Sequence, residues 1–378
     1  MHRLQFHYTL SRESSPAQVR NPLIDLLQAV STHGSISAAA RALDLSYRHV
    51  WGELKRWEQE LGNELLIWEK GQSARLTEFG SKLMWAESQA QARLAPQIEA
   101  LRSELERAFA VAFDPQAHVA MLYASHDDAL GTLREYALAA DATSALHTRL
   151  HLDIRFSGSV DAIRALNEGR CVMAGFHTIQ NPVRGSVAEK IYKPLLKPGL
   201  HKIIGFATRT QGLMVAKGNP LRLHSLQDVR DCNARFINRA MGTGTRVVLD
   251  ELLAQTGLDA AQFPGYDTTE PSHTAVAHAI ASGAADAGLG IEVAARAQGL
   301  DFVPLLEESY HLVCLKSALN DPAIQALMQL LKSAAWQARL DALPGYRAWH
   351  SGEVQSLRRV LPWWDFGAKR KAAEGAAP

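Results

Sequence analysis

The apolar residues between positions 22 and 57 recur every three or four places, which is the spacing of helices that bury one face. Pro22 stands at the start of the first such segment, which ends at Ser31. Two further segments follow on either side of the turn 43–45, and serines that can act as N-caps precede them. The pattern predicts three helices, of which the last two form a helix-turn-helix.

The second helix of this pair begins after Ser46 and directs Val50, Leu54 and Trp57 inward. Its outer face carries the polar and basic side chains Tyr47, Arg48, His49 and Lys55. In a helix-turn-helix, the first residues of the second helix contact base edges, and basic groups contact phosphates. A helical hairpin with a solvated basic face is the alternative interpretation. Gly52 costs this helix about 1 kcal/mol relative to Ala, which a close approach of another backbone would explain.

Two apolar runs, 65–68 and 74–77, flank a polar turn that contains a glycine, and together they predict a β-hairpin. Lys70 and Arg75 lie where such a wing would touch phosphate. From 78 to 112 the apolar residues recur at alternating three- and four-residue steps, so this long helix needs a partner along its length. Pro96 is expected to kink or break it. The stripe includes Leu94, Ile98, Leu101 and Leu105.

From Val119 onward, short apolar runs alternate with helical patterns, which predicts a parallel sheet in a three-layer α/β domain. A second lobe begins near Ser225. The predicted strands cover residues 119–123, 150–156, 171–176, 203–208, 212–217, 234–237 and 310–315.

Several of the strand-to-helix loops place a hydroxyl or a glycine at a helix N-terminus, where free N–H groups and the helix dipole attract anions. These residues are Ser125, Ser159, Thr243, Gly244, Thr245 and Ser272. Arg239 and Arg246 flank the richest loop and can add charge-assisted hydrogen bonds. Each loop alone is explained equally by helix capping. Their repetition at the carboxyl ends of parallel strands, where ligands bind in open α/β sheets, favours a ligand site.

Composition indicates an ordinary globular chain of 378 residues with 47% hydrophobic and 21% charged residues. The formal net charge is only +1, so any DNA affinity must come from a local patch. Cys171, Cys232 and Cys314 lie far apart, which predicts reduced core thiols and no metal site. No signal peptide and no membrane-spanning run is found, so we expect a cytoplasmic protein.

Catalytic motifs are not found, and we expect a protein that is not an enzyme. The adjacent carboxylates of Asp127 and Asp128 point apart, and the sequence Ser125-His126-Asp127 is no triad, because a triad is assembled from separated positions. The histidines include no HExxH pair, and the GTGT loop lacks the Lys and Ser or Thr of a P-loop.

The order helix-turn-helix, LGNELLIWEK, ARLTEFG and a long helix resembles the winged N-terminal domain of LysR-type and molybdate-responsive regulators, over about residues 20–112. The segment Ser46–Trp51 is more similar to the molybdate-responsive group. In both families the long helix pairs two subunits, which implies dimerisation through the stripe named above. Packing of that helix on its own effector domain is the alternative.

The loop GTGTR and the later segment SHTAVAHAIASGAADAGLG resemble the type 2 periplasmic-binding-protein superfamily over about residues 118–345. More narrowly, they are similar to the domain attached to molybdenum-cofactor biosynthesis proteins and to molybdate-type regulators. The resemblance implies two lobes that close on a small ligand, usually an anion. The pocket residues it implies are Ser125, Ser159, Thr243, Thr245 and Arg246, with Arg239, His177, Ser272 and Tyr310 behind them.

We therefore expect a transcription regulator with an α/β, two-lobed effector region preceded by an α+β winged helix-turn-helix and a long linker helix. Its expected parts are the DNA-binding domain at 1–77, the linker helix at 78–114, the sensing domain at 115–345 and a partly disordered segment at 346–378. Its expected partners are a double-stranded DNA operator and a second subunit, as a homodimer or homotetramer, with no membrane. Molybdate, tungstate or a molybdenum-cofactor species is the expected effector, with no covalent cofactor. The alternatives are a small carboxylate such as formate or, in a different class, a solute-binding transport component.

Overall fold

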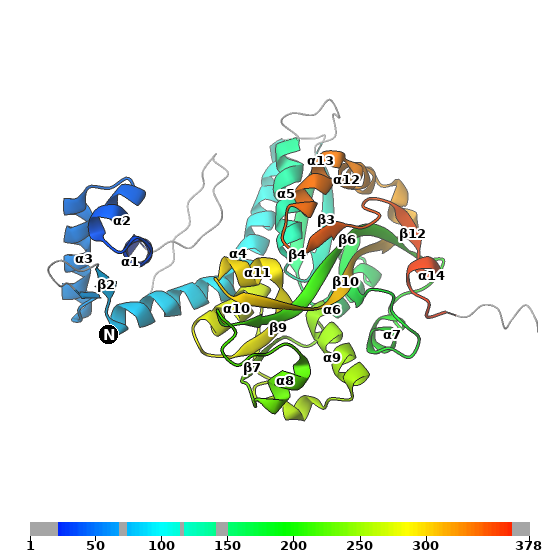
Figure 1. Cartoon of the computed structure of the whole chain (residues 1–378). Coiled ribbons are helices and arrows are strands. Elements are labelled where there is room, and N and C mark those ends of the chain that lie inside the picture. The colour runs from blue at the N-terminus through cyan, green and yellow to red at the C-terminus, as the bar shows by residue number, and fades with distance from the viewer. Residues whose placement is uncertain (1–21, 68–73, 114–116, 141–149, 365–378) are drawn as a thin grey trace, which may run out of the picture. The chain divides into compact units, whose positions relative to one another are not determined.

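The computed structural model describes residues 22–67, 74–113, 117–140 and 150–364 (Figure 1). The chain divides into two compact units, Met1–Ile98 and Glu99–Pro378. The long helix α4 (Glu78–Phe113) contains the division between them. It is one continuous helix through Pro96, so the helix is not broken at this proline, and the kink expected there stays a prediction.

Three helices form the core of the first unit: α1 (Pro22–His33), α2 (Ile36–Ala42) and α3 (Tyr47–Leu61). Val50 and Leu54 are buried against α1 and α2, while Trp57 is half-buried at the edge of the same cluster. These contacts confirm the predicted helix-turn-helix.

Serine hydroxyls begin both helices of the pair, as the sequence predicts. Ser35 Oγ accepts the backbone N–H of Ala38 at 3.1 Å, and Ser46 Oγ accepts that of His49 at 3.2 Å. Asp44 makes the turn between the helices with a left-handed φ of 54°, a conformation that aspartate tolerates better than most residues.

A short antiparallel hairpin of β1 (Leu66–Ile67) and β2 (Arg75–Leu76) follows α3. Gly80 lets α4 start against it, because a Cβ at Gly80 would lie 2.5 Å from the carbonyl oxygen of Leu65. The predicted wing is therefore present at its base, and its tip, with Lys70, lies outside the described residues.

The second unit is built on one curled sheet with the strand order β4-β3-β5-β10-β6-β9-β7-β8, and β11 and β12 also pair with β6. Its strands are β3 (His118–Ala124), β4 (Leu150–Phe156), β5 (Met173–Ile179), β6 (His201–Val215), β7 (Phe236–Arg239), β8 (Thr269–Glu270), β9 (Ala287–Ile291), β10 (Asp301–Leu315), β11 (Tyr346–Ala348) and β12 (Val354–Ser356). Its further helices are α5 (Asp128–Ala140), α6 (Ser159–Asn167), α7 (Val187–Tyr192), α8 (Leu226–Asp231), α9 (Gly244–Thr256), α10 (His273–Ala281), α11 (Glu292–Ala297), α12 (Pro322–Lys332), α13 (Ala334–Asp341) and α14 (Leu357–Val360).

Strands β6 and β10 are antiparallel, 15 residues long each, and join the two ends of the sheet (Figure 1). One half of this pair continues into β5, β3 and β4, which we call the first lobe, and the other half into β9, β7 and β8, the second lobe. The predicted parallel pairing is present within each lobe, between β3 and its neighbours and between β7 and its neighbours, but the antiparallel β6 and β10 make the whole sheet mixed. The two strands predicted at 203–208 and 212–217 are the single strand β6, and the polar residues Arg209 and Gln211 between them are buried within it.

Helices cover both faces of the first lobe. Ala120, Leu122 and Ala124 of β3 pack in the same cluster as α5 and α12, whereas Met121 and Tyr123 pack with α6. This alternation is that of a strand buried on both faces, and it confirms the predicted three layers.

The folded domain continues past the predicted boundary at 345. Strands β11 and β12 pair with β6, and Trp363 is 2% exposed in a core cluster that also contains Leu357 and Leu361. These strands are three residues each, too short to show a period in the sequence. The segment 365–378, predicted to be disordered, lies outside the described residues.

Candidate ligand site and DNA-binding surface

The loops that precede α6 and α9 meet where the two lobes face each other. The backbone N–H of Val160 donates to the carbonyl oxygen of Gly242 at 3.2 Å. Gly158 permits this contact, since a Cβ there would lie 2.8 Å from the same oxygen. The two lobes are thus in direct contact in this structure.

The first lobe contributes buried hydroxyls and rings to this place. Ser125 Oγ and Ser159 Oγ lie 3.5 Å apart, and the rings of His177 and Tyr310 stack with centroids 3.9 Å apart. All four residues are buried. The Tyr310 hydroxyl and both ring nitrogens of His177 have no hydrogen-bond partner among the described residues.

The second lobe contributes the first residues of α9 and α10. Thr245 Oγ1 lies 3.3 Å from His273 Nε2 and 3.3 Å from the side-chain amide nitrogen of Gln211. Gly244 lies against His177, because a Cβ on it would be 2.4 Å from His177 Nδ1. The structure thus brings α9 and His177 together, as the resemblance implied.

Two predicted site hydroxyls have capping roles. Thr243 Oγ1 accepts the backbone N–H of Arg246 at 3.4 Å and donates to the carbonyl oxygen of Ala240 at 2.7 Å. Ser272 Oγ accepts the N–H of Ala275 at 3.1 Å. These hydroxyls therefore stabilise the starts of α9 and α10. If they also bind a ligand, they do so besides this capping role.

Arg239 is the charged group of the site. It ends β7, it is 2% exposed, and its Nε and Nη1 atoms find no acceptor among the described residues. Burial and the nearby Arg209 lower the pKa of this guanidinium to about 9. A buried donor without a partner costs about 1–3 kcal/mol, and more when it is charged. An anion bound here would remove that cost.

The structure gives Arg246 a different role from the predicted one. Its Nε lies 3.2 Å from Asp250 Oδ1, one turn further along α9, and its guanidinium stacks 4.1 Å from the ring centroid of Tyr266. Because Arg246 already has a carboxylate partner on its own helix, we assign the positive charge of the site to Arg239 instead.

A buried ion cluster next to the site was missed by sequence reasoning. Arg209 bonds to the carboxylates of both Asp127 and Glu308, which are all but inaccessible to solvent. Tyr346 Oη donates to Asp127 Oδ2 at 2.8 Å, and Gln211 Nε2 donates to Glu308 Oε1 at 2.8 Å. Arg209 and Glu308 face each other in the register of β6 and β10, a pairing hidden from a sequence reading that divided β6 at this point.

The histidines of the site are neutral. Burial, Arg209 and Arg239 hold the pKa of both His177 and His273 well below its ordinary value. Neutral imidazole can both donate and accept a hydrogen bond. We use the name interlobe site for Ser125, Ser159, His177, Arg239, Thr245, His273 and Tyr310.

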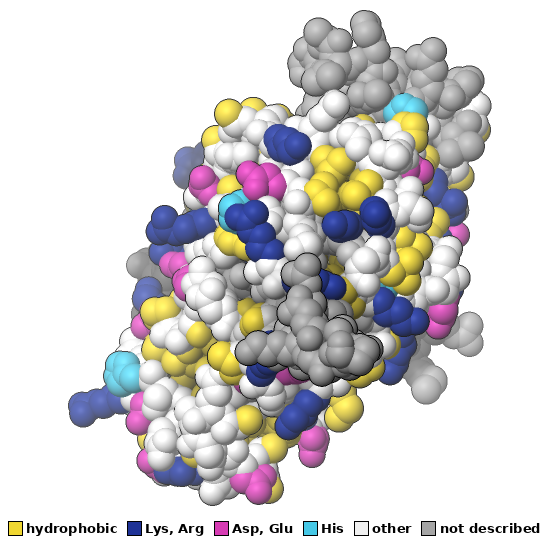
Figure 2. Space-filling model, turned by 90° about the vertical axis from the view of Figure 1, so that its right-hand side faces the viewer, with side chains coloured by type: hydrophobic (Ala, Val, Ile, Leu, Met, Phe, Trp, Pro, Cys, Tyr) yellow, Lys and Arg dark blue, Asp and Glu magenta, His cyan; other side chains and the backbone are white. Residues whose placement is uncertain are grey.

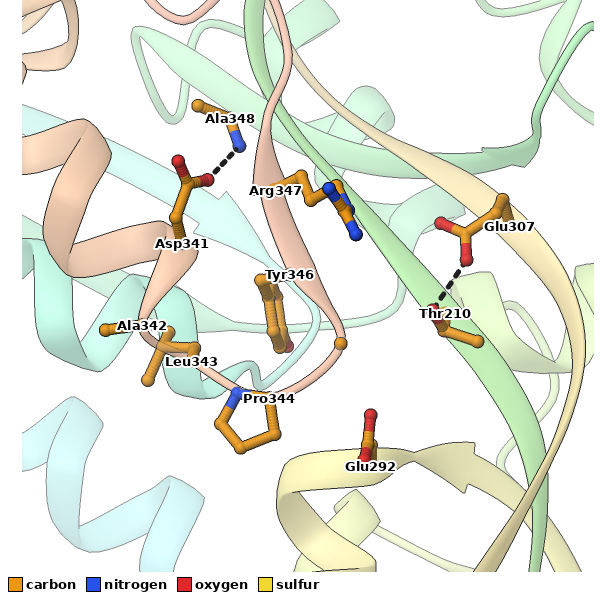
Figure 3. A pocket seen from close by; sticks show the side chains of 11 residues that line it. Thr210, Glu292, Glu307, Asp341, Ala342, Leu343, Pro344, Tyr346, Arg347 and Ala348 are labelled. Carbon is orange, nitrogen blue, oxygen red and sulfur yellow. Dashed lines mark hydrogen bonds between the residues drawn. The ribbon is translucent and has the colours of Figure 1, made fainter.

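Tyr346 also lines a separate surface pocket of about 650 Å³ (Figure 3). Thr210 Oγ1 donates to Glu307 Oε1 at 2.6 Å at its edge, and Glu292 and Asp341 also line it. Three carboxylates make this pocket unsuitable for an anion, so the interlobe site is the better candidate.

The predicted DNA-contacting residues of α3 are exposed, with Tyr47 at 48% and Arg48 and His49 beside it. Lys55 forms a 2.6 Å ion pair with Glu58 on its own helix. Arg75 is exposed on β2.

No described atom lies within 4 Å of a Cβ built at Gly52, so the close backbone approach considered as an explanation for this glycine is not found within the described residues.

The apolar stripe of α4 is largely exposed. Leu94, Leu101 and Leu105 are 36%, 56% and 37% exposed, and Ile98 is half-buried. Exposed leucines at helical spacing are the pattern of a helix that packs against a partner.

Cys171 and Cys314 are buried and Cys232 is exposed, all as free thiols, so the prediction of three core cysteines is wrong for Cys232.

In the part of the chain that the structure describes, no group of His, Cys, Asp and Glu could hold a metal ion, and no helix is long and apolar enough to cross a membrane. On the face drawn in Figure 2, Lys and Arg side chains are spread among hydrophobic and neutral ones.

A winged helix-turn-helix joined to a two-lobed α/β domain is the architecture of a ligand-responsive regulator. Residues 140–332 match the model of the PBP superfamily domain, and residues 23–81 match that of the bacterial regulatory helix-turn-helix protein, lysR family. The chain belongs to the PBP superfamily by the larger match, and its N-terminal part is similar to the helix-turn-helix of the lysR family.

Two curated relatives are similar to parts of this chain. YvgK of Bacillus subtilis, an uncharacterized protein, is 33% identical over 200 residues, which are 53% of this chain and 64% of that protein. This chain thus covers less than two thirds of YvgK. A protein encoded in the 5′ region of the 2Fe-2S ferredoxin gene of Clostridium pasteurianum is 34% identical over 109 residues, 29% of this chain and 96% of that protein.

Two solved structures are similar to this chain at low sequence identity. A hydrogen peroxide-bound OxyR mutant of Corynebacterium glutamicum is 14% identical, with 80% of this chain and 88% of that chain covered and a TM-score of 0.42. ArgP of Mycobacterium tuberculosis is 21% identical, with 83% and 96% covered and a TM-score of 0.39.

Proposed function

We propose that this chain is a transcription regulator that binds operator DNA through its winged helix-turn-helix and senses a small anion in the interlobe site. It acts in the cytoplasm, where its DNA target lies. The observation that carries the proposal is the buried guanidinium of Arg239, whose Nε and Nη1 lack acceptors among the described residues. Such a group is stabilised by a ligand that supplies anionic oxygens.

The burial of the site favours a ligand of few atoms. Ser125 is the most exposed of the residues that define the interlobe site, at 7%. Buried hydroxyls, an arginine and helix N-termini suit a tetrahedral oxyanion. Molybdate or tungstate is therefore the leading effector, in line with the resemblance to molybdenum-associated families. Formate is the alternative, and a molybdenum-cofactor species requires a more open cleft.

Linkage between ligand and DNA follows from the two lobes. The anion binds groups of both lobes, so it favours the arrangement in which the lobes are in contact. If that arrangement also alters how two helix-turn-helix units are presented, ligand shifts operator affinity, and DNA shifts ligand affinity by the same factor. The exposed stripe of α4 supports assembly into a homodimer or homotetramer, which a two-fold-related operator requires.

A solute-binding transport component is the competing class. Its binding domain would have the same two lobes, but it would have no use for a capped helix-turn-helix with exposed Tyr47, Arg48 and His49. The helix-turn-helix therefore favours the regulator.

A melting screen tests the ligand proposal. The full chain is heated with molybdate, tungstate, sulfate, phosphate or formate, each at rising concentration. A ligand at about 100 times its Kd adds roughly 2.7 kcal/mol to the free energy of unfolding, which raises the melting temperature. A rise with molybdate or tungstate at lower concentration than with the other anions is the expected result. If none of the five raises the melting temperature, the free-anion proposal is wrong.

A further inference from the structure

Four fully buried charged side chains beside the interlobe site cancel one another. Arg209 is bonded to Asp127 and Glu308, and Arg239 adds the second positive charge. Two arginines and two carboxylates give a formal charge of zero. A doubly charged anion would therefore bring two uncompensated negative charges into a place with little access to solvent, where such charges are costly.

His177 is the side chain best placed to compensate one of the two negative charges of the anion. Both of its ring nitrogens lack a partner among the described residues, and its Nδ1 lies against Gly244 at the start of α9. The ring stacks on Tyr310 at 3.9 Å between centroids, so a protonated His177 would gain a cation–π contact.

His273 is a poorer candidate. Its Nε2 lies at hydrogen-bonding distance from Thr245 Oγ1, so among the described residues it has one unpartnered ring nitrogen, whereas His177 has two. The titratable and charged groups around His177 explain why it is neutral in the empty site: they are Arg209, Arg239, His273, Tyr310 and His311.

We propose that His177 takes up one proton from solvent when a doubly charged oxyanion enters the interlobe site, so that the anion and the proton are bound together. The inference rests on the proposed function and adds the charge class of the effector. The proton goes to a ring nitrogen, and no covalent bond of the anion changes. A second nitrogen–hydrogen donor then faces the site, and the net charge of the occupied site falls from two negative charges to one.

The proposal predicts how affinity depends on pH. While His177 is neutral in the free protein and protonated in the complex, each unit of rising pH weakens molybdate binding about tenfold. Molybdate itself carries two charges and no proton near neutral pH, so this dependence comes from the protein.

Isothermal titration calorimetry of the full chain with sodium molybdate provides the test. Titrations at the same pH in two buffers with different ionisation enthalpies give the number of protons taken up. We expect about one proton per anion for the wild type and for the control His224→Gln, whose exposed side chain lies outside the interlobe site. For His177→Gln we expect almost none and a Kd that changes little with pH.

Proton uptake near zero in the wild type would overturn the proposal without any variant, and full uptake in His177→Gln would overturn the assignment to His177. Molybdate that binds without proton uptake leaves the proposed function standing. Absence of binding by both molybdate and tungstate at every pH overturns this inference together with the proposed effector.

Discussion

The side-chain amide nitrogen of Gln211 donates to Glu308 Oε1 at 2.8 Å, within the strand pair that joins the two lobes. The same nitrogen lies 3.3 Å from Thr245 Oγ1, at the start of α9. Gln211 thus connects the buried ion cluster around Arg209 with the interlobe site. Neither end of this connection is accessible to solvent.

Replacing Gln211 tests whether this connection supports the fold. Gln211→Met keeps the volume but removes a donor from the buried Glu308 carboxylate, so we expect the free energy of unfolding to fall by about 1–3 kcal/mol. Urea denaturation measures it. Gln227→Met on α8, where the side chain is exposed, is the matched control and should leave stability almost unchanged. Equal stability of both variants would show that the Gln211 hydrogen bonds contribute nothing measurable.

The exposed start of α3 predicts two different effects on DNA binding. Arg48→Ala should weaken specific binding by about 1–3 kcal/mol if Arg48 contacts a base edge. Arg75→Ala, on the wing, should weaken binding to all sequences and reduce its salt dependence, because a phosphate contact is lost. Mobility-shift titrations against selected operator and random DNA at several salt concentrations separate the two. An Arg48→Ala variant that binds like the wild type would remove Arg48 from the interface.

The stripe of α4 predicts assembly. Ile98→Glu combined with Leu101→Glu places two charges on this stripe, so we expect an oligomer to dissociate into monomers. Sedimentation velocity gives the mass, and the double variant Glu87→Gln and Glu104→Gln on the same helix serves as control. If the doubly charged variant keeps the mass of the wild type, the stripe packs within the subunit.

Acid should destabilise the ligand-free protein through its buried histidines. Burial lowers the pKa of His311 from 6.5 to about 3, and its Nε2 lies 3.0 Å from Thr178 Oγ1. Between these values the unfolded chain binds a proton that the folded chain does not, so stability falls as the pH falls below 6.5. At about pH 5 the loss from this one residue is about 2 kcal/mol relative to neutral pH.

The measurement is urea denaturation of wild type and His311→Gln at about pH 7 and pH 5. The variant lacks the titrating group, so its loss on acidification should be smaller by the stated amount. Parallel curves for the two proteins would show that His311 does not titrate differently in the folded and unfolded states.

Local features of this fold were readable from the sequence, while features that depend on distant partners were not. The N-caps Ser35 and Ser46 and the inward Val50 and Leu54 follow from short-range spacing, and the structure has them as predicted. Strand β6 was divided because Thr210 and Gln211 interrupt its apolar pattern. Only the pairing with β10 shows that this polar stretch is where the strand passes from one lobe to the other.

The two arginines beside the GTGT loop illustrate the same limit. The partner of Arg246, Asp250, stands four residues later, so their ion pair was visible in the sequence as a helical neighbour. Whether Arg239 has a hydrogen-bond acceptor depends on which groups the two lobes bring around it. These groups are distant in the sequence, so no local sequence pattern shows that its Nε and Nη1 lack an acceptor among the described residues. The sequence therefore located the loop and both guanidinium groups, and the contacts in the structure support the proposal of Arg239 over Arg246.

The most direct test of the central claim compares Arg239→Met with its matched control Arg246→Met. Arg239 is a buried charge with no ion pair to a carboxylate among the described residues, so its removal should raise the ligand-free stability by about 1–3 kcal/mol and abolish stabilisation by molybdate. The control should keep the molybdate response of the wild type, roughly 2.7 kcal/mol at about 100 times Kd. Thermal melting with and without molybdate gives both quantities. An Arg239→Met protein that molybdate stabilises as much as the wild type would contradict an anion site at Arg239.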